Sequence, residues 1–242
     1  AIAHGADLIA LGRADVVVAG GTDAALHPMT VAAFAAMRAL STRNDEPETA
    51  SRPFAADRDG FVLGEGAGVL VLESVAHATA RGARILAVLA GAAVTADAFD
   101  TARPEPSGAQ QEQALRLALE RAGIQADQIG LVNAHATSTP VGDRVEAEVL
   151  ARTLPGAPVS ATKSASGHLL GGAGALEAVL TVMALRDGWM PPTLQPGGID
   201  PVIAGLGLDV VEPQGRQAPG LETAVSTSFG FGGHNVALVF AR

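Results

Sequence analysis

The segment Ile129–Pro140, with the sequence IGLVNAHATSTP, decides the fold class of this chain. Its apolar first part, Ile129–His135, predicts a strand, and the polar residues after it lead into a predicted helix at Asp143–Leu154. Working outward, Pro158–Thr162 predicts another strand, and Gly171–Arg186 is apolar on nearly every side, which predicts a buried central helix. Strands and helices that alternate in this way indicate an α/β protein built in layers.

The same alternation continues through the rest of the chain. A β-branched run closed by glycines, Asp15–Ala19, predicts a strand buried on both faces. The polar, proline-broken stretch Ser41–Arg58 predicts a surface loop. The remaining predicted elements are two strands around a glycine-rich bend in Phe61–Glu73, a buried strand at Ile85–Val94, a helix that ends at Gly123, and two strands around Gly230–Gly233 in Thr223–Arg242.

Composition excludes several classes of protein. With 48% hydrophobic and 17% charged residues among 242, the chain is unlike a disordered or fibrous one. A net charge of −9 argues against nucleic-acid binding, and no apolar run reaches the roughly 20 residues of a membrane span. There is no Cys, which excludes disulfides, thiolate-bound zinc and a cysteine nucleophile within these residues. The first residues lack a signal-peptide pattern and read as the middle of a helix.

Two of the six histidines lie where a site is expected. His135 follows a predicted interior strand, and His168 lies in a loop just before the predicted buried helix. The alternative interpretation is a pair of ordinary surface or core histidines. Lys163 needs an acidic partner in its apolar surroundings, and Glu177 is the nearest candidate for a structural ion pair. Asp143 is expected either to orient His135 or to cap its own helix.

The glycine-rich segments do not predict a phosphate or zinc site. Gly64–Gly68 does not match GxGxxG, and the segment after Gly167 lacks the GK[ST] of a P-loop. There is no HExxH, and the two histidines have no zinc-ligand spacing. The segment Gly230–Gly233 differs, because glycines around Phe231 let the backbone approach a substrate while the ring acts as a gate.

Four motifs in this order resemble the elongating β-ketoacyl-acyl-carrier-protein synthases, of the synthase II type in the thiolase superfamily. They are RPFAADRDGFVLGEGAGVLVLE (52–73), NAHATSTPVGD (133–143), TKSASGHLLGGAGALEA (162–178) and SFGFGGHN (228–235). The resemblance implies a thiolase-like layered αβαβα fold, here incomplete. Residues 1–83 would be the end of the N-terminal ketoacyl-synthase half and residues 84–242 the C-terminal half.

The resemblance also implies a chemistry, the decarboxylative Claisen condensation of an acyl thioester with malonyl-carrier protein. By the family pattern His135 and His168 are catalytic and Lys163 supports them. Asp143 and Glu177 would be supporting residues. Thr137, Thr139, Phe229, Phe231 and Gly232 would bind substrate, with Phe231 as the acyl gate. Asn133 and Glu177 match positions that hold a structural monovalent cation in some members; no other cofactor or metal is implied. The chain reads Ser226-Thr227-Ser228-Phe229 where many relatives read Ser-Asn-Ser-Phe.

The implied partners are an acyl carrier protein with acyl or malonyl phosphopantetheine and a second copy in a homodimer, in the cytoplasm. Arg38 and Arg43 are candidates for docking the acidic carrier protein. In the family the nucleophilic Cys lies a few residues before the segment matched by Ala1–Ile2, so we expect the C-terminal portion of a synthase. The alternatives are a non-catalytic ketosynthase-like partner subunit or a chain-length-factor-like module. Chain-length preference, and fatty-acid against mycolate or polyketide synthesis, stay open.

Overall fold

The computed structural model describes residues 1–242, and its elements alternate between strands and helices as predicted. The α-helices are α1 (Ile2–Ala10), α2 (Pro28–Ala36), α3 (Val75–Ala80), α4 (Ala109–Ala122), α5 (Pro140–Thr153), α6 (Lys163–Ser166), α7 (Ala173–Asp187) and α8 (Pro201–Ala204). The strands are β1 (Val16–Asp23), β2 (Gly66–Glu73), β3 (Val88–Ala96), β4 (Val132–Asn133), β5 (Pro158–Ser160), β6 (Trp189–Met190), β7 (Asp209–Val210), β8 (Arg216–Gln217), β9 (Thr223–Gly230) and β10 (His234–Ala241). Short 3-10 turns lie at η1 (Pro47–Thr49), η2 (Ala126–Gln128) and η3 (Leu170–Gly172).

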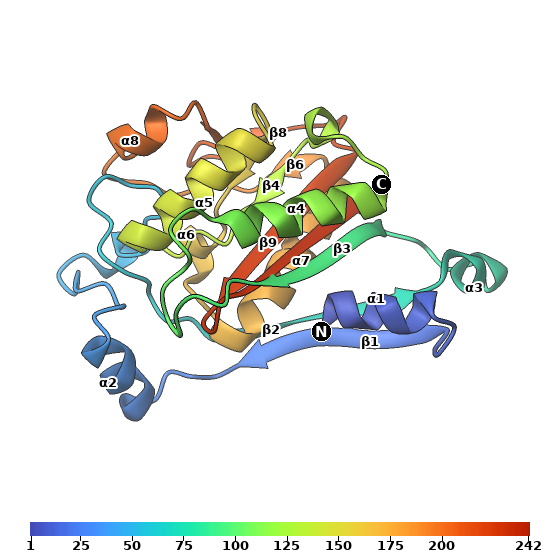
Figure 1. Ribbon diagram of the computed structural model, residues 1–242, viewed down its shortest axis with the longest axis horizontal. Helices are drawn as coiled ribbons and strands as arrows, with labels where there is room; N and C mark the ends of the chain where they lie inside the picture. Colours follow the sequence, from blue (N-terminus) through green and yellow to red (C-terminus); the bar gives the residue numbers. More distant parts are fainter.

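The elements form four layers (Figure 1). A six-stranded sheet has the order β3-β10-β9-β4-β5-β7, and α4 and α5 cover one of its faces. The helices α7 and α1 pack between this sheet and the antiparallel β1–β2 pair. A further antiparallel pair, β6–β8, lies at the end of α7. The predicted layered α/β architecture is therefore present as α–β–α–β.

Small residues let the layers approach closely at two points. A side chain at Gly68 in β2 would place its Cβ 2.5 Å from the backbone of Ala175 and Leu176 in α7. A side chain at Gly91 in β3 would lie 2.1 Å from the carbonyl oxygen of Ala118 in α4. At both points a strand backbone rests directly on a helix backbone, which only glycine allows.

The predicted burial of the strands in the first half of the chain is wrong on one face. In β1 the side chains of Val17 and Ala19 point toward α1, but Val18 is 71% exposed, next to Val71 of β2. In β3, an edge strand, Ala93 is buried while Val94 is exposed. A β-branched run is suited to double-sided burial, but it does not by itself supply the layer that would cover the second face.

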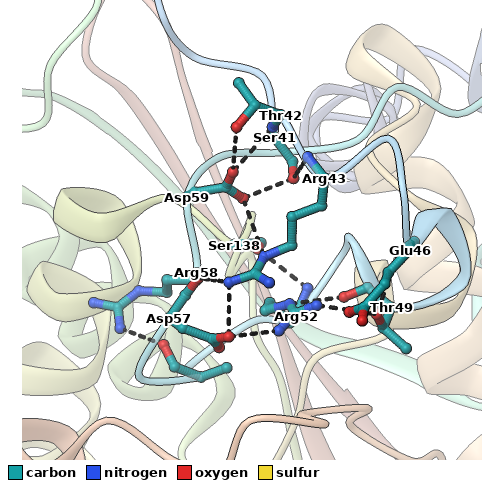
Figure 2. A network of polar contacts seen from close by, with 11 residues as sticks. Ser41, Thr42, Arg43, Glu46, Thr49, Arg52, Asp57, Arg58, Asp59 and Ser138 are labelled. Atoms are coloured by element: carbon teal, nitrogen blue, oxygen red, sulfur yellow. Dashed lines mark hydrogen bonds and ion pairs between the residues drawn. The ribbon is translucent and has the colours of Figure 1, made fainter.

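The stretch Ser41–Arg58 is only partly the surface loop that was predicted. Its second part turns inward, where Arg52, Phe54 and Arg58 are buried. Figure 2 shows how charged side chains hold this segment together: Asp57 accepts hydrogen bonds from both Arg43 and Arg52, each at 2.7 Å. The prolines and charges of this stretch predicted exposed side chains. Part of it is buried instead, because salt bridges pair the charges that burial removes from water.

Two strand predictions are corrected, one in the number of strands and one in length. Phe61–Glu73 holds one strand, β2, because Phe61 and Leu63 each make only a single bridge, to Leu40 and His168. The strand predicted at Ile129–His135 is limited to Val132–Asn133 in β4. The buried helix predicted at Gly171–Arg186 is confirmed as α7, and the glycine stop of α4 is confirmed at Gly123, which has φ +66°. None of the helices combines the length and hydrophobicity that crossing a bilayer requires.

Candidate active site

Three neighbouring strands position the candidate site. β9, β4 and β5 are parallel to one another in the six-stranded sheet, so their carboxyl ends share one edge. His135 follows β4, Lys163 follows β5, and Phe229 and Phe231 lie at the end of β9. Side chains that are far apart in the sequence therefore gather at one edge of the sheet.

The two histidines singled out from the sequence lie against each other. The ring centroids of His135 and His168 are 5.4 Å apart, and the ring planes are nearly perpendicular at 84°. The backbone of His168 is held by the segment before β2: its N–H donates to the carbonyl of Val62 at 2.7 Å, and its carbonyl accepts the N–H of Gly64 at 3.0 Å. This juxtaposition favours a shared site over two unrelated histidines.

The Nδ1 atom of His135 faces a cation. It lies 3.3 Å from Nζ of Lys163, and an ammonium group has protons to donate but no lone pair to accept with. Nδ1 is therefore the acceptor, and the ring proton sits on Nε2. Burial, together with the positive charge of Lys163, holds the pKa of His135 well below its usual range. The ring is a neutral donor at pH 7.

His168 reaches the same tautomer by a different contact. Its Nδ1 accepts the backbone N–H of Leu170 at 3.3 Å, which again leaves the proton on Nε2. Burial, and then the nearby charge of Lys163, lowers the pKa of His168 to about 3. Both imidazoles are thus neutral at pH 7, with one N–H each to donate.

The expected ion pair between Lys163 and Glu177 is present, and both side chains are buried. Burial raises the pKa of Glu177 to about 7, and the positive charge of Lys163 opposes this rise. Oε1 of Glu177 accepts from Lys163, while its Oε2 has no hydrogen-bond partner. Lys163 therefore connects the carboxylate of α7 to the ring of His135.

Asp143 caps its helix and does not orient His135. Its carboxylate accepts the N–H of Phe54 at 2.9 Å and the N–H of Thr139, the N-cap of α5, at 3.2 Å. Burial raises the pKa of Asp143 to about 7. The orienting alternative is wrong because Nδ1 of the His135 ring faces Lys163, and the hydrogen bonds of Asp143 go to the backbone of Phe54 and Thr139.

Glu146 is a site residue that the sequence analysis missed. It is buried, and its carboxylate accepts the backbone N–H of His135 at 2.8 Å, the N–H of Ala136 at 2.6 Å and the hydroxyl of Thr227 at 2.7 Å. Burial raises its pKa. The available signal was its spacing, because Glu146 lies at i+3 from Asp143 and at i−3 from the buried Val149, on the inward face of a helix.

The two threonines predicted to bind substrate lie next to each other, with their hydroxyl oxygens 3.1 Å apart. Ser138 between them has φ +71°, a conformation that non-glycine residues rarely adopt. The segment shown in Figure 2 holds it there: the N–H of Arg52 donates to Oγ of Ser138 at 3.1 Å, and the N–H of Gly60 to its carbonyl at 3.0 Å.

Aromatic side chains line the approach to the histidines. The ring of Phe229 lies 5.9 Å from that of His135, and the ring of Phe61 lies 5.3 Å from that of His168. Phe231 is 47% exposed and stacks on Phe34 of α2 at 6.1 Å. Gly232 after it has φ +82° and donates to the carbonyl of Thr101 at 2.8 Å. Phe231 is thus at the surface and not packed in the core.

Two neutral N–H donors on adjacent rings are the kind of groups that can stabilise a negative charge developing on an oxygen atom. Comparison with protein-family models identifies the family of the chain. Residues 1–78 match the beta-ketoacyl synthase N-terminal domain, and residues 86–196 match the beta-ketoacyl synthase C-terminal domain. The chain belongs to the β-ketoacyl synthase family.

Curated relatives of this β-ketoacyl synthase chain include 3-oxoacyl-[acyl-carrier-protein] synthase 2 from Vibrio cholerae, which is 48% identical over the whole chain. The protein of the same name from Synechocystis is 46% identical over 97% of the chain. The chain spans 59% of the length of the Vibrio protein and 56% of the Synechocystis protein.

Solved structures share the fold over the full chain. A beta-ketoacyl synthase from Burkholderia phymatum has a TM-score of 0.94 at 42% identity, and the chain covers 58% of it. A type II polyketide ketosynthase in complex with its acyl-carrier protein has a TM-score of 0.94 at 34% identity, with 59% covered. The four layers seen here are therefore part of the thiolase-like ketosynthase fold.

Two buried oxygens test whether residues of this chain fit the structural cation expected from the sequence. Oε2 of Glu177 and Oγ of Ser226 are buried without a hydrogen-bond partner. They are close neighbours of Asn133, which pairs with Ser226 in the sheet and donates from its side chain to the carbonyl of Glu177 at 3.2 Å. The hydroxyl of Thr227 donates to Glu146 at 2.7 Å. Oxygen ligands of this kind fit a small monovalent cation.

Proposed function

We propose that this chain is the part of a 3-oxoacyl-[acyl-carrier-protein] synthase that generates the malonyl-derived nucleophile during fatty-acid chain elongation. The single observation that carries the proposal is the pair of neutral imidazoles, His135 and His168, each held with its proton on Nε2. The curated relatives of 45–48% identity carry the same synthase name, which favours this function over a non-catalytic partner subunit or a chain-length factor.

The proposed step breaks the bond between the malonyl methylene and its carboxylate. Carbon dioxide leaves, and the electron pair moves onto the thioester carbonyl oxygen as an enolate. The Nε2–H groups of His135 and His168 donate to that oxygen, where the charge develops. The enolate carbon then attacks an acyl thioester on a cysteine, the new carbon–carbon bond forms, and the cysteine leaves as a thiolate. That cysteine is not among these residues.

The substrate arm is proposed to reach the histidines past Thr137 and Thr139, whose adjacent hydroxyls suit the amide groups of phosphopantetheine. Phe231 would act as the gate of the acyl channel and Phe229 as part of its wall, with Gly232 allowing the turn. An acyl carrier protein would deliver the arm; the type II polyketide ketosynthase of the same fold is likewise found in complex with its acyl-carrier protein. The homodimer and the cytoplasmic location stay predictions.

The test uses a Cys-bearing fusion, in which this chain follows the cysteine-containing segment of the Vibrio cholerae relative. His135→Ala and His168→Ala should each slow malonyl decarboxylation by about 10²–10³-fold, while acyl loading of the cysteine, followed by intact mass, is retained. His4→Ala, an exposed histidine on α1, is the control. The isolated chain should show no acyl adduct. Near-normal decarboxylation in either histidine variant would overturn the proposal.

A structural cation near Asn133 is proposed as well, ligated by Oε2 of Glu177 and Oγ of Ser226. Lys163 donates to Oε1 of Glu177 only, and the cation would neutralise the charge on Oε2, which has no hydrogen-bond partner. Replacing sodium or potassium by choline should lower the melting temperature of the chain, and Ser226→Ala should remove that dependence. Equal melting temperatures in both salts for the unmodified chain would contradict the cation.

A further inference from the structure

The turn after His168 is strained. η3 contains Leu170, whose φ is +48°, in the left-handed region that residues with a Cβ rarely adopt. The residue with this strained φ also donates its own N–H to Nδ1 of His168, so the hydrogen bond to the histidine lies at the start of the strained turn. Such strain persists only where the surrounding structure holds it.

The end of β1 holds this turn from the opposite side. Oδ2 of Asp23 accepts the N–H of Gly171 at 3.0 Å, directly after the strained residue. The backbones also touch, because a Cβ on Gly21 would lie 2.4 Å from the carbonyl oxygen of Gly171. The carboxylate of Asp23 makes the side-chain hydrogen bond between β1 and the turn, and its hydrogen bonds do not include His168.

We propose that Asp23 is a positioning residue for His168: by binding the N–H of Gly171, it maintains the left-handed turn at Leu170 and so keeps the proton of His168 on Nε2. Without Asp23 the turn relaxes toward a right-handed conformation and the Leu170 N–H leaves Nδ1. The ring then takes either tautomer, and the molecules in which Nε2 is unprotonated have no proton there to donate. The effect on rate rests on the proposed function, whereas the effect on the tautomer does not.

The experiment reads the tautomer directly in the 242-residue chain, labelled with ¹⁵N-histidine, at pH 7. The unmodified chain should give one pyrrole-like and one pyridine-like nitrogen signal for His168. Asp23→Ala should shift the two signals toward each other. Asp23→Asn keeps an oxygen acceptor and should resemble the unmodified chain, as should Asp15→Ala, an exposed aspartate just before β1.

A double variant tests the strain itself. Glycine adopts positive φ readily, so Asp23→Ala with Leu170→Gly should restore the single-tautomer signals.

In the Cys-bearing fusion, Asp23→Ala should lower kcat for decarboxylation by about 10-fold with KM unchanged. This effect is smaller than the loss of about 10²–10³-fold expected when a donor is removed. An unchanged His168 spectrum in Asp23→Ala would overturn the proposal. If Asp23→Ala does not fold, the double variant Asp23→Ser with Leu170→Gly is measured in its place. The proposal is overturned if this variant lacks the single-tautomer His168 signals of the unmodified chain. A changed spectrum with an unchanged rate would uphold the positioning and count against the proposed function.

Discussion

Glu146 accepts the backbone N–H of His135 at 2.8 Å, so a carboxylate buried in α5 holds the histidine that follows β4. The same carboxylate accepts from Ala136 and from Thr227 of β9. One side chain thereby joins a helix and two parallel strands at the edge where the candidate site lies. The position of the His135 ring consequently depends on a residue that takes no direct part in the proposed chemistry.

Removing this acceptor should cost stability. Glu146→Ala leaves the buried N–H of Ala136 without its acceptor, and the N–H of His135 keeps only the hydroxyl of Thr227 at 3.1 Å, so we expect a loss of about 1–3 kcal/mol in the free energy of unfolding. Glu148→Ala, two residues along the same helix, breaks only the exposed pair with Arg144 and should cost about 0.5 kcal/mol or less. Urea unfolding of both variants measures the difference; equal losses would contradict the role of Glu146.

The buried histidines should make stability depend on pH. The folded-state pKa of His168 is about 3, while an unfolded histidine titrates near its usual value of about 6.5. Below that value the unfolded chain binds a proton that the folded chain does not, so stability falls as pH falls from about 6.5 toward about 3.

Carboxyl groups with raised pKa values, such as Asp143, act in the opposite direction, so the comparison needs a variant. Relative to His168→Gln, the unmodified chain should lose about 2 kcal/mol between pH 7.5 and pH 5. Unfolding in urea at both pH values measures this. A difference between the two proteins that does not change with pH would show that His168 is not buried as a neutral ring.

The turn beside Phe231 should control acyl transfer. Valine in place of Gly232 opposes the φ of +82° and brings a Cβ to 3.3 Å from the ring of His234. In the Cys-bearing fusion, Gly232→Val should slow acyl transfer to the cysteine more than malonyl decarboxylation, because only the first needs an open channel. Gly156→Val is the control, since Gly156 has φ +79° in open space away from the gate. Equal slowing of both half-reactions would contradict a gate.

Carrier-protein docking should depend on Arg38 and not equally on Arg43. Arg38 is exposed and makes no ion pair, whereas Arg43 is bound to Asp57 at 2.7 Å (Figure 2). In the Cys-bearing fusion, Arg38→Glu should raise KM for the acidic carrier-bound substrate several-fold at low salt, with the difference shrinking at high salt. Arg43→Glu should change KM less. Salt-independent KM values that match the unmodified fusion would remove Arg38 from the docking surface.

The sequence by itself determined the features that depend on local pattern. Apolar residues all around Gly171–Arg186 are compatible only with a buried helix, and α7 lies between the two sheets. Gly123 ends α4 because a residue without Cβ takes the left-handed conformation that closes a helix. His135 was found because it follows a predicted strand, and His168 because it lies just before the predicted buried helix.

Only the tertiary structure decided which distant groups meet and which faces are covered. The valines of β1 have the same pattern whether or not another layer lies over them, and Val18 is exposed. The role of Glu146 was missed, because its partners Ala136 and Thr227 come from two other segments. The left-handed turn at Leu170 and its bond to Asp23 across 148 positions have no local signal at all. Such contacts arise from chain packing, and sequence periodicity describes only neighbours along one element.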